Sequence, residues 1–380
     1  MSDTSNDDWD PRAASVQEDQ RRAYDDMRER CPVAASEFLG WSLFRHQDVI
    51  DVLADPRTYS SASRHPAIPN GMDPPDHRPF RDALAPHFST DRMIAMEPRC
   101  RAIATDLLEP MVVNGHAEFV DDFATPFPLK VLCAFLGWPE QLWECLGGWT
   151  HGNQEAAFTR DRAAGKALAR LFSEHVEANL AAHRSRPNVS DDVTDGLLGT
   201  SVNGRHLEDE QLVSILRNWT AGHGTVSAAL SILVLHLAEQ QELQQRLRVD
   251  PWLIPAAIEE ILRSDDPLVA NRRTTTGEVE IGGRTIPAGS SLTLIWIAAN
   301  RDPRAFEDPE SIELRRGMDA DLVWGRGIHL CLGAPLARLE MRVALEGLLG
   351  RTKRFEVAGD APRRTTYPSN GLVALPLRFG

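Results

Sequence analysis

The 380-residue sequence predicts a mainly α-helical protein with small β-sheets. Two observations lead to this fold class. Apolar residues recur with a helical period across most of residues 77–185 and again from Glu208 to Gln240. Alternating runs with Gly–Gly and Pro–Ala–Gly turns, as in EVEIGGRTIPAGSSLTLIWI, come late in the chain and indicate hairpins. No repeat or low-complexity linker divides the chain, so we expect a single domain over residues 19–380.

The N-terminal part predicts short elements separated by loops. Residues 1–18 are acidic and polar, and we expect a loose tail there. GWSLFR at residues 40–45 predicts a strand, and HQDVIDVLADP predicts a helix that Pro56 ends. The segments 60–75 and 185–196 are rich in turn-forming and polar residues and predict surface loops.

The longest predicted helix runs from Glu208 to Gln240 and would span about 50 Å. Its middle, ALSILVLHLA, is apolar on several faces, which predicts that the helix is buried. Further helices are predicted at about Ile254 to Arg263 and from Pro335 to Leu349, and the C-terminal RRTTYPSNGLVALPLRF predicts strands around a turn.

Composition narrows the class of function. The chain has 41 basic and 55 acidic residues, a net charge of −14, which argues against a nucleic-acid or anionic membrane partner. The 5 cysteines are widely spaced without a Cys-x-x-Cys pair, which argues against a disulfide framework or structural zinc. There is neither an apolar signal core nor a run approaching the ~18–20 apolar residues of a membrane span. We therefore expect a cytoplasmic protein.

The densest motif is WGRGIHLCLG at residues 324–333, which leads directly into a helix. Cys331 precedes the helix N-terminus, where free N–H groups favour an anion and hence a thiolate. The glycines, Gly333 among them, let the backbone approach a flat group closely. Trp324 offers a ring near the sulfur, and Arg326 and His329 offer donors to a nearby anion. A buried core cysteine and a nucleophilic cysteine are the alternative interpretations.

This run resembles the cysteine loop of the cytochrome P-450 family, in the soluble bacterial type. That loop reads Phe-x-x-Gly-x-x-x-Cys-x-Gly, and residues 324–333 match it except that tryptophan replaces phenylalanine. The resemblance implies a triangular domain with haem b buried between the long central helix and the cysteine-loop helix. It also implies that Cys331 is the axial ligand of the haem iron.

Two further family motifs occur in the expected order. The chain contains three Glu-x-x-Arg matches, and an isolated pair is usually a surface helix pair. Position singles out Glu260 and Arg263, which by resemblance form a buried structural network with Arg316. In MDPPDHRPFR, His77 and Arg81 lie four residues apart, on one face of a predicted helix. Taken alone, this pair could be an ordinary solvated basic start of a helix. By resemblance they bind a haem propionate together with Arg273 and His329.

The third motif, Ala221-Gly-His-Gly-Thr225, lies in the middle of the long helix, where two glycines cost about 1 kcal/mol each relative to alanine. In the family this run lies over the haem and reads Ala-Gly-x-acid-Thr, and the acid and alcohol relay protons. Thr225 matches the alcohol, but Gly224 replaces the acid. Three interpretations stay open: His223 or a water chain replaces the acid, the substrate supplies a polar group, or peroxide replaces O2. His223 could equally be a core or helix-surface histidine.

The leading functional hypothesis is a monomeric monooxygenase that inserts oxygen from O2 into a C–H bond of a small lipophilic molecule, by hydroxylation or oxidative dealkylation. A separate ferredoxin and reductase would supply electrons. A peroxygenase and a non-catalytic haem sensor are the alternatives. The loop from Ser61 to Asp73 is short, so we expect the pocket to be open there or covered by another segment. By resemblance, substrate contacts are expected from the following residues: Ala221, Thr225, Leu268, Val269, Asn271, Asn370 and Leu372.

Overall fold

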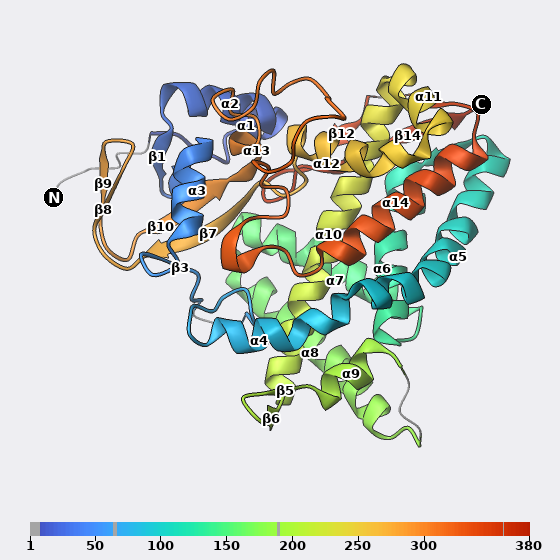
Figure 1. Ribbon diagram of the computed structural model, residues 1–380, viewed down its shortest axis with the longest axis horizontal. Coiled ribbons are helices and arrows are strands. Elements are labelled where there is room, and N and C mark those ends of the chain that lie inside the picture. The colour runs from blue at the N-terminus through green and yellow to red at the C-terminus, as the bar shows by residue number, and fades with distance from the viewer. Residues whose placement is uncertain (1–7, 64–66, 188–190, 360) are drawn as a thin grey trace.

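The long helix α10 (Asp209–Glu239) passes through the middle of the molecule, as the computed structural model in Figure 1 shows. The structure describes residues 8–63, 67–187, 191–359 and 361–380. Glu208 and Gln211 close a capping box at the start of α10, so the predicted helix is confirmed to within one residue at each end. By length and composition α10 could cross a membrane, but 67% of its most apolar window is buried inside the fold, as in a core helix.

Most of the remaining helices pack around α10 on the side of the molecule away from the large sheet (Figure 1). The helical prediction for residues 77–185 is confirmed as a series of helices separated at Gly115, Gly137 and Arg160, each in the left-handed conformation that ends a helix. The other helices are α1 (Ala14–Glu18), α2 (Gln20–Arg30), α3 (His46–Ala54), α4 (His77–Leu84), α5 (Thr90–Asn114), α6 (Pro126–Leu136), α7 (Leu142–Thr159), α8 (Arg162–Arg184), α9 (Val193–Gly199), α11 (Gln241–Val249), α12 (Ile254–Ser264), α13 (Trp296–Ala299), α14 (Ala334–Arg351) and the short η1 (Ala85–Phe88), η2 (Val120–Ala124), η3 (Pro251–Leu253) and η4 (Gly327–His329).

The strands form one five-stranded sheet and several small ones. The large sheet has the order β1-β2-β10-β7-β3, with β10 parallel to β2 and antiparallel to β7. The predicted late hairpin is confirmed as β8 and β9, and the following run joins the large sheet as β10. The strands are β1 (Val33–Ser36), β2 (Gly40–Leu43), β3 (Tyr59–Ser60), β4 (His116–Glu118), β5 (Ser201–Val202), β6 (Arg205–His206), β7 (Ala270–Thr275), β8 (Val279–Ile281), β9 (Arg284–Ile286), β10 (Ser291–Ile295), β11 (Phe355–Val357), β12 (Arg363–Arg364), β13 (Leu372–Ala374) and β14 (Pro376–Phe379).

The expected loose tail is not what the structure shows for residues 8–18; residues 1–7 lie outside the described part. Trp9 is buried and makes edge contacts with the rings of Tyr24 and Phe44, at centroid distances of 5.9 and 5.3 Å. Asp8 accepts a hydrogen bond from the backbone of Ala35. A single aromatic residue thus anchors an otherwise polar segment to the core.

The predicted loop at 185–196 also needs a correction. Helix α9 begins inside it at Val193, because the Asp192 carboxylate caps the helix by accepting from the backbone of Asp195 at 3.0 Å. Residues 188–190 of this loop, like residues 64–66 of the loop at 60–75, lie outside the described residues.

A buried charge network on α12 binds the segment 300–316, which follows α13. Arg263 is fully buried and forms two hydrogen bonds to Glu260, at 2.8 and 2.9 Å. Arg316 reaches the same carboxylate at 2.8 Å. Arg263 also donates to the carbonyls of Asn300 and Pro309. The three side chains of the predicted network, Glu260, Arg263 and Arg316, therefore meet. Burial alone would raise the pKa of Glu260, but the hydrogen bonds from the two arginines outweigh it and hold this pKa below its usual value.

We predict that Glu260→Gln lowers the free energy of unfolding by about 3–5 kcal/mol, because Arg263 then keeps a buried charge without a counter-ion. Denaturant unfolding followed by circular dichroism would measure the change. The exposed Glu239→Gln at the end of α10 is the control and should stay close to wild type. Equal stability of the two variants would contradict the structural role of the network.

Candidate functional site

Cys331 lies in a tight turn between η4 and α14. Its backbone N–H donates to the carbonyl of Trp324 at 2.8 Å, which closes the loop on itself. Gly325 and Gly327 both have φ of +70°, a conformation that side-chain-bearing residues rarely adopt. A Cβ on Gly327 would also approach the Leu53 carbonyl oxygen to 3.0 Å. The loop therefore requires glycine at these two positions.

The Cys331 side chain is accessible, although the protein surrounds it closely enough for burial to raise the pKa of its thiol. Four groups oppose this rise: the backbone N–H groups of Gly333 and Ala334, which donate to the sulfur, and the charges of Arg81 and Arg338. These donors at the helix start suit a thiolate, and coordination to a metal would deprotonate the thiol outright. The sulfur is thus presented as a ligand rather than packed as a core residue.

The middle of α10 is exposed where a core helix should be covered. Ala221 and Gly222 are both exposed, and nothing lies within 4 Å of a Cβ placed on Gly222. The residues that follow, from Val226 onward, are almost all buried. Helix α14 and the loop before it lie beside α10 (Figure 1), and this loop also exposes the apolar Ile328 and Leu330. Accessible apolar groups on both segments are the surface that a large apolar group would cover.

Four basic side chains converge beside the cysteine loop. The rings of His77 and His329 lie 4.4 Å apart between centroids, and Arg81 donates to the Leu330 carbonyl. Burial, together with the nearby charges of Arg273, His77 and Arg81, lowers the pKa of His329 to about 4. Nε2 of His77 and both ring nitrogens of His329 are buried without a hydrogen-bond partner among the described residues. Unpaired ring nitrogens beside two arginines suit a bound anion, which would accept from the N–H groups and favour protonation of the rings.

Arg326 does not join this cluster. It is exposed, and its guanidinium donates to the carbonyl of Asp319 at 2.7 Å. The sequence could not show whether the Arg326 side chain points towards the basic cluster or away from it, because Arg326 lies in the same glycine-rich turn as His329.

Trp324 has its own partners, which explain why tryptophan is accommodated here. Its indole N–H donates to Glu259 at 2.7 Å, and the guanidinium of Arg338 lies over the ring at 4.5 Å. Arg338 in turn donates to Glu259 at 2.6 Å. A phenylalanine could not make the N–H bond, so the tryptophan ties the loop to both α12 and α14.

His223 is directed at α14. Its Nδ1 lies 2.8 Å from the Trp219 carbonyl, and its Nε2 lies 3.4 Å from the fully buried carboxylate of Glu340. Burial alone would lower the pKa of His223, but Glu340 outweighs it and raises this pKa above its usual value. Both ring nitrogens thus face protein groups. Glu340 was missed from the sequence, because nothing in LARLE indicates that its carboxylate points at α10.

Comparison with known proteins identifies the family of the chain. The family model for Cytochrome P450 matches residues 252–379. The chain is 34% identical to the Cyclomarin C epoxidase CymV of Salinispora arenicola, over 88% of this chain and 89% of that protein. It is also 34% identical to the Erythromycin C-12 hydroxylase of Saccharopolyspora erythraea, over 89% and 88% of the two chains. The chain belongs to the cytochrome P450 family.

Solved structures agree with this assignment. A mutant of P450 EryK in complex with erythromycin B superposes with a TM-score of 0.88 at 32% identity, over 95% of this chain and 96% of that one. P450BioI in complex with an acyl carrier protein gives a TM-score of 0.87 at 27% identity, over 97% and 100%. The mainly helical P450 fold with small sheets is therefore confirmed.

This cytochrome P450 is a haem-thiolate monooxygenase, and its residues fit the haem b that the family carries. Cys331 offers the sulfur ligand, and the unpaired nitrogens of His77 and His329 match the two carboxylates at the edge of a haem. The glycine-rich turn and the exposed face at Ala221 and Gly222 leave room for the flat ring system.

The expected substrate residues differ in what they can contact. Ala221, Leu268 and Asn271 retain accessible surface. Val269 and Leu372 are buried in the protein, and the Asn370 amide donates to Asp265 at 2.7 Å inside a buried network. The structure therefore does not bring these three side chains to an accessible surface, because residues 268–270 and 369–374 pair and pack with each other and with α10.

A different residue covers α10 from the loop at 60–75. Ile68 is buried, its N–H donates to Ser214 Oγ at 3.0 Å, and its carbonyl accepts from the Asn218 amide at 2.9 Å. Ser214 and Asn218 lie one helical turn apart on α10, just before Ala221. Ile68 belongs to this short loop itself, so a described part of the loop lies on α10, and the expectation of an open pocket or one covered by another segment stays a prediction.

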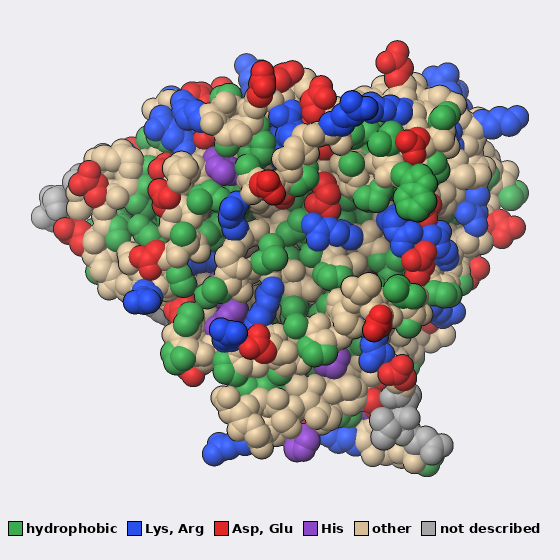
Figure 2. All heavy atoms as spheres, in the orientation of Figure 1, with side chains coloured by type: hydrophobic (Ala, Val, Ile, Leu, Met, Phe, Trp, Pro, Cys, Tyr) green, Lys and Arg blue, Asp and Glu red, His purple; other side chains and the backbone are tan. Residues whose placement is uncertain are grey.

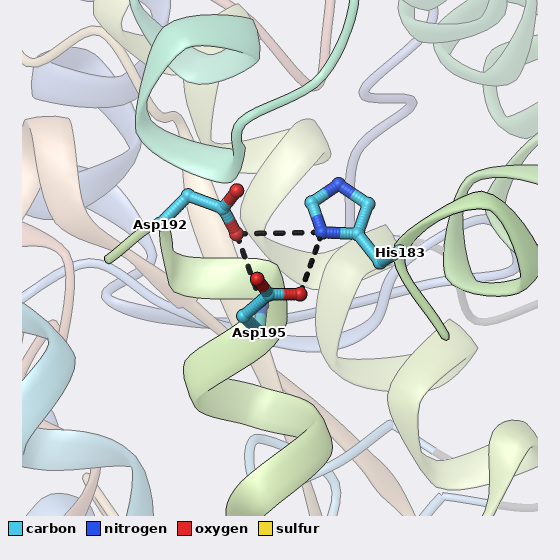
Figure 3. Close-up of side chains that lie close together, drawn as sticks. All are labelled: His183, Asp192 and Asp195. Carbon is cyan, nitrogen blue, oxygen red and sulfur yellow. Dashed lines mark hydrogen bonds and ion pairs between the residues drawn. The ribbon is translucent and has the colours of Figure 1, made fainter. Parts of the chain in front are cut away.

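A second cluster of titratable side chains lies far from Cys331 in the sequence, and Figure 3 shows it. His183 Nδ1 lies 2.9 Å from Asp195 and 3.5 Å from Asp192. The geometry could suit a metal ion, but Arg186 donates to Asp192 at 3.0 Å and already supplies the positive charge. The cluster is best understood as a junction between α8 and α9, which Arg186 extends to the Gly137 carbonyl at the end of α6.

We predict that His77→Phe and Arg273→Leu each speed haem loss about 10- to 100-fold, because each removes a charge-assisted hydrogen bond of about 1.5–3 kcal/mol. Transfer of haem to an excess of an apo-haem acceptor protein would measure the rate. Arg78→Leu, an exposed neighbour of His77 on α4, is the control. Unchanged haem loss in both variants would show that these side chains do not hold the propionates.

We predict a pH-dependent effect of Glu340→Gln. Since Glu340 raises the pKa of His223, the ionised pair stabilises the fold near pH ~6.5 and loses this contribution as pH rises through the pKa of His223 in the folded state. Burial raises the pKa of Glu340, so the contribution also falls at lower pH, where this carboxylate becomes protonated. At pH 6 the variant should lose about 1–3 kcal/mol of unfolding free energy, and the loss should shrink towards pH 9. Glu346→Gln, which removes a more accessible ion pair on α14, is the control. A loss that grows with pH would contradict the assignment.

Proposed function

We propose that this cytochrome P450 inserts one oxygen atom from O2 into a C–H bond of a small lipophilic molecule, by hydroxylation or oxidative dealkylation. The observation that carries the proposal is the combination of an accessible Cys331 with the exposed Ala221 and Gly222 of α10, one turn before the half-buried Thr225. A sulfur ligand alone would suit a haem sensor, whereas a hydroxyl kept beside the open part of the helix suits proton delivery during turnover.

Each protein group has a distinct part in this chemistry. The haem, when bound, supplies the redox centre that activates oxygen. Cys331 would hold it through a thiolate that the helix start and Arg81 favour. His77, Arg81, Arg273 and His329 would orient it by its carboxylates. The exposed Ala221 and Gly222 leave space on α10 for a reacting group, and Thr225 Oγ would hold the proton that enters the reaction.

The accessible surface supports a lipophilic substrate. Ala221 is apolar and exposed on α10, and Ile68 adds an apolar cover on the same helix. Similar proteins include a Vitamin D(3) 25-hydroxylase, a 6-deoxyerythronolide B hydroxylase, and P450BioI with an acyl carrier protein that carries a fatty acid. These names support an apolar substrate without selecting between a free and a carrier-bound one.

We further propose that a ferredoxin and its reductase supply the electrons, and that the enzyme acts in the cytoplasm as a monomer. Exposed arginines surround the cysteine loop: Arg78 on α4, Arg326 in the loop and Arg338 on α14. Figure 2 shows Lys and Arg side chains spread over this face of a protein whose net charge is −14. A local basic surface suits an acidic electron donor. The free cysteines among the described residues suit a reducing compartment.

A peroxide-driven reaction is the second candidate, and one observation favours it. Gly224 occupies the position where the family carries an acid, so the chain lacks the usual side chain for proton delivery to reduced oxygen. Peroxide already contains the protons and electrons that this delivery would supply. Thr225, which the peroxide route does not require, favours the O2-dependent reaction instead.

We predict that lipophilic compounds which shift the Soret band of the ferric protein towards high spin are oxygenated when NADH, ferredoxin and reductase are present. Product formation with this electron supply should exceed that with hydrogen peroxide by at least about tenfold. Mass spectrometry with 18O2 would detect the incorporated atom, and Cys331→Ser is the inactive control. Product with peroxide alone would select the peroxygenase, and a Soret shift without product in either system would select a haem sensor.

A further inference from the structure

Three consecutive residues of α10 face three different surroundings. Gly222 faces open space, His223 faces Glu340 on α14, and Gly224 faces α7. Successive residues of a helix point about 100° apart, so this division follows from helical geometry. It means that the position which carries the acid in the family is directed, in this chain, at the residues of α7.

Helix α7 leaves no room for a side chain at position 224. A Cβ on Gly224 would lie 2.6 Å from Cγ2 of Thr150, a distance that requires one of the two groups to move. Thr150 cannot easily move, because its Oγ1 donates to the Leu146 carbonyl at 2.9 Å and β-branched side chains have few rotamers in a helix. Turning the methyl away would break that hydrogen bond. Glycine at 224 is therefore a packing requirement, and an acid there is excluded as long as Thr150 is present.

The next α7 residue on the same face supplies a polar group. Gln154 lies four residues after Thr150, and its Nε2 would be 3.5 Å from a Cβ on Gly224. The side chain is half-buried, and among the described residues its amide has no hydrogen-bond partner. An amide donates and accepts hydrogen bonds but does not titrate, so it can orient a water molecule without itself providing a proton.

We propose that Gln154 is the positioning residue that replaces the missing acid: it orients water beside Gly224 for proton transfer to the Thr225 hydroxyl, and Thr150 keeps position 224 free of any side chain. The inference rests on the proposed O2-dependent function. The proton originates in solvent and passes through the ordered water to Thr225 Oγ as this hydroxyl releases its own proton to the reacting group, so the amide and the hydroxyl both end neutral. Gln154 thus acts through Thr225 rather than on the substrate.

Thermal unfolding tests the packing step without any activity. Gly224→Ala should lower the unfolding midpoint of the wild type, because the new methyl meets Thr150. In the Thr150→Ser background, which removes Cγ2 and keeps the hydroxyl, the same substitution should raise the midpoint by about 1–3 °C, as alanine normally does in a helix. A Gly224→Ala effect of the same sign and size in both backgrounds would overturn this step.

Coupling of NADH oxidation to product tests the role of Gln154. In Gln154→Leu, an apolar variant of similar size, the share of NADH that ends as peroxide should rise at least threefold. The Soret shift on binding the same substrate and the unfolding midpoint should stay at wild-type values. Asn153→Ala, at the exposed neighbouring position on α7, is the control. Unchanged coupling in Gln154→Leu would overturn the proposal.

The pH profile separates positioning from mere packing. Coupled turnover of the wild type should show no step attributable to a carboxylate, since Gln154 does not titrate. Gln154→Glu should restore coupling lost in Gln154→Leu and add a new acidic limb to the profile; an unaltered profile would overturn the proposal. Absence of any NADH-driven product in the wild type would instead overturn the proposed function, and this role of Gln154 with it, while the Thr150 and Gly224 stability cycle would still report on the packing.

Discussion

The architecture of the site depends on how the fully buried charge of Arg263 is neutralised. Glu260 supplies the counter-charge, and the carbonyl of Asn300 accepts one of the remaining guanidinium protons. The side chain of Asn300 then accepts from the backbone of Leu322 at 2.8 Å, two residues before Trp324. A strong ionic interaction in α12 is thereby linked, through one asparagine, to the start of the loop that presents Cys331. The position of Cys331 therefore depends in part on the Arg263–Glu260 interaction, although the contacts run through Asn300 and Leu322.

Helix α10 forms the side of the site opposite the cysteine loop, and its residues must meet several structural requirements at once. The helix must be buried to hold the domain together, exposed at Ala221 and Gly222 to leave room for a cofactor, and close to α7 at Gly224. Small residues at positions 221, 222 and 224 satisfy the last two demands at a cost in helix stability. The His223 interaction with Glu340 lies at the same turn, where it joins the weakened part of α10 to α14.

The sequence predicted those features that depend on local pattern or on contiguous motifs. The bounds of α10, the hairpin of β8 and β9, and the cysteine turn all follow from residues close together in the chain. It failed where a single distant partner decides the outcome. Trp9 orders an acidic segment through Tyr24 and Phe44, which no N-terminal pattern reveals. The Asn370 amide is occupied by Asp265, and the role of Ile68 depends on Ser214 and Asn218. Such partners become apparent only when the fold brings them together.

The contact between Gly224 and Thr150 also restricts how this enzyme can change over generations. A mutation that introduces an acid at 224 arrives in a chain where Thr150 still blocks the space, so it is selected against for its effect on folding before any catalytic benefit appears. Loss of the Thr150 methyl has to come first. The two sites therefore form an ordered mutational path, and lineages that diverged with different residues at position 150 would have different access to an acid at 224.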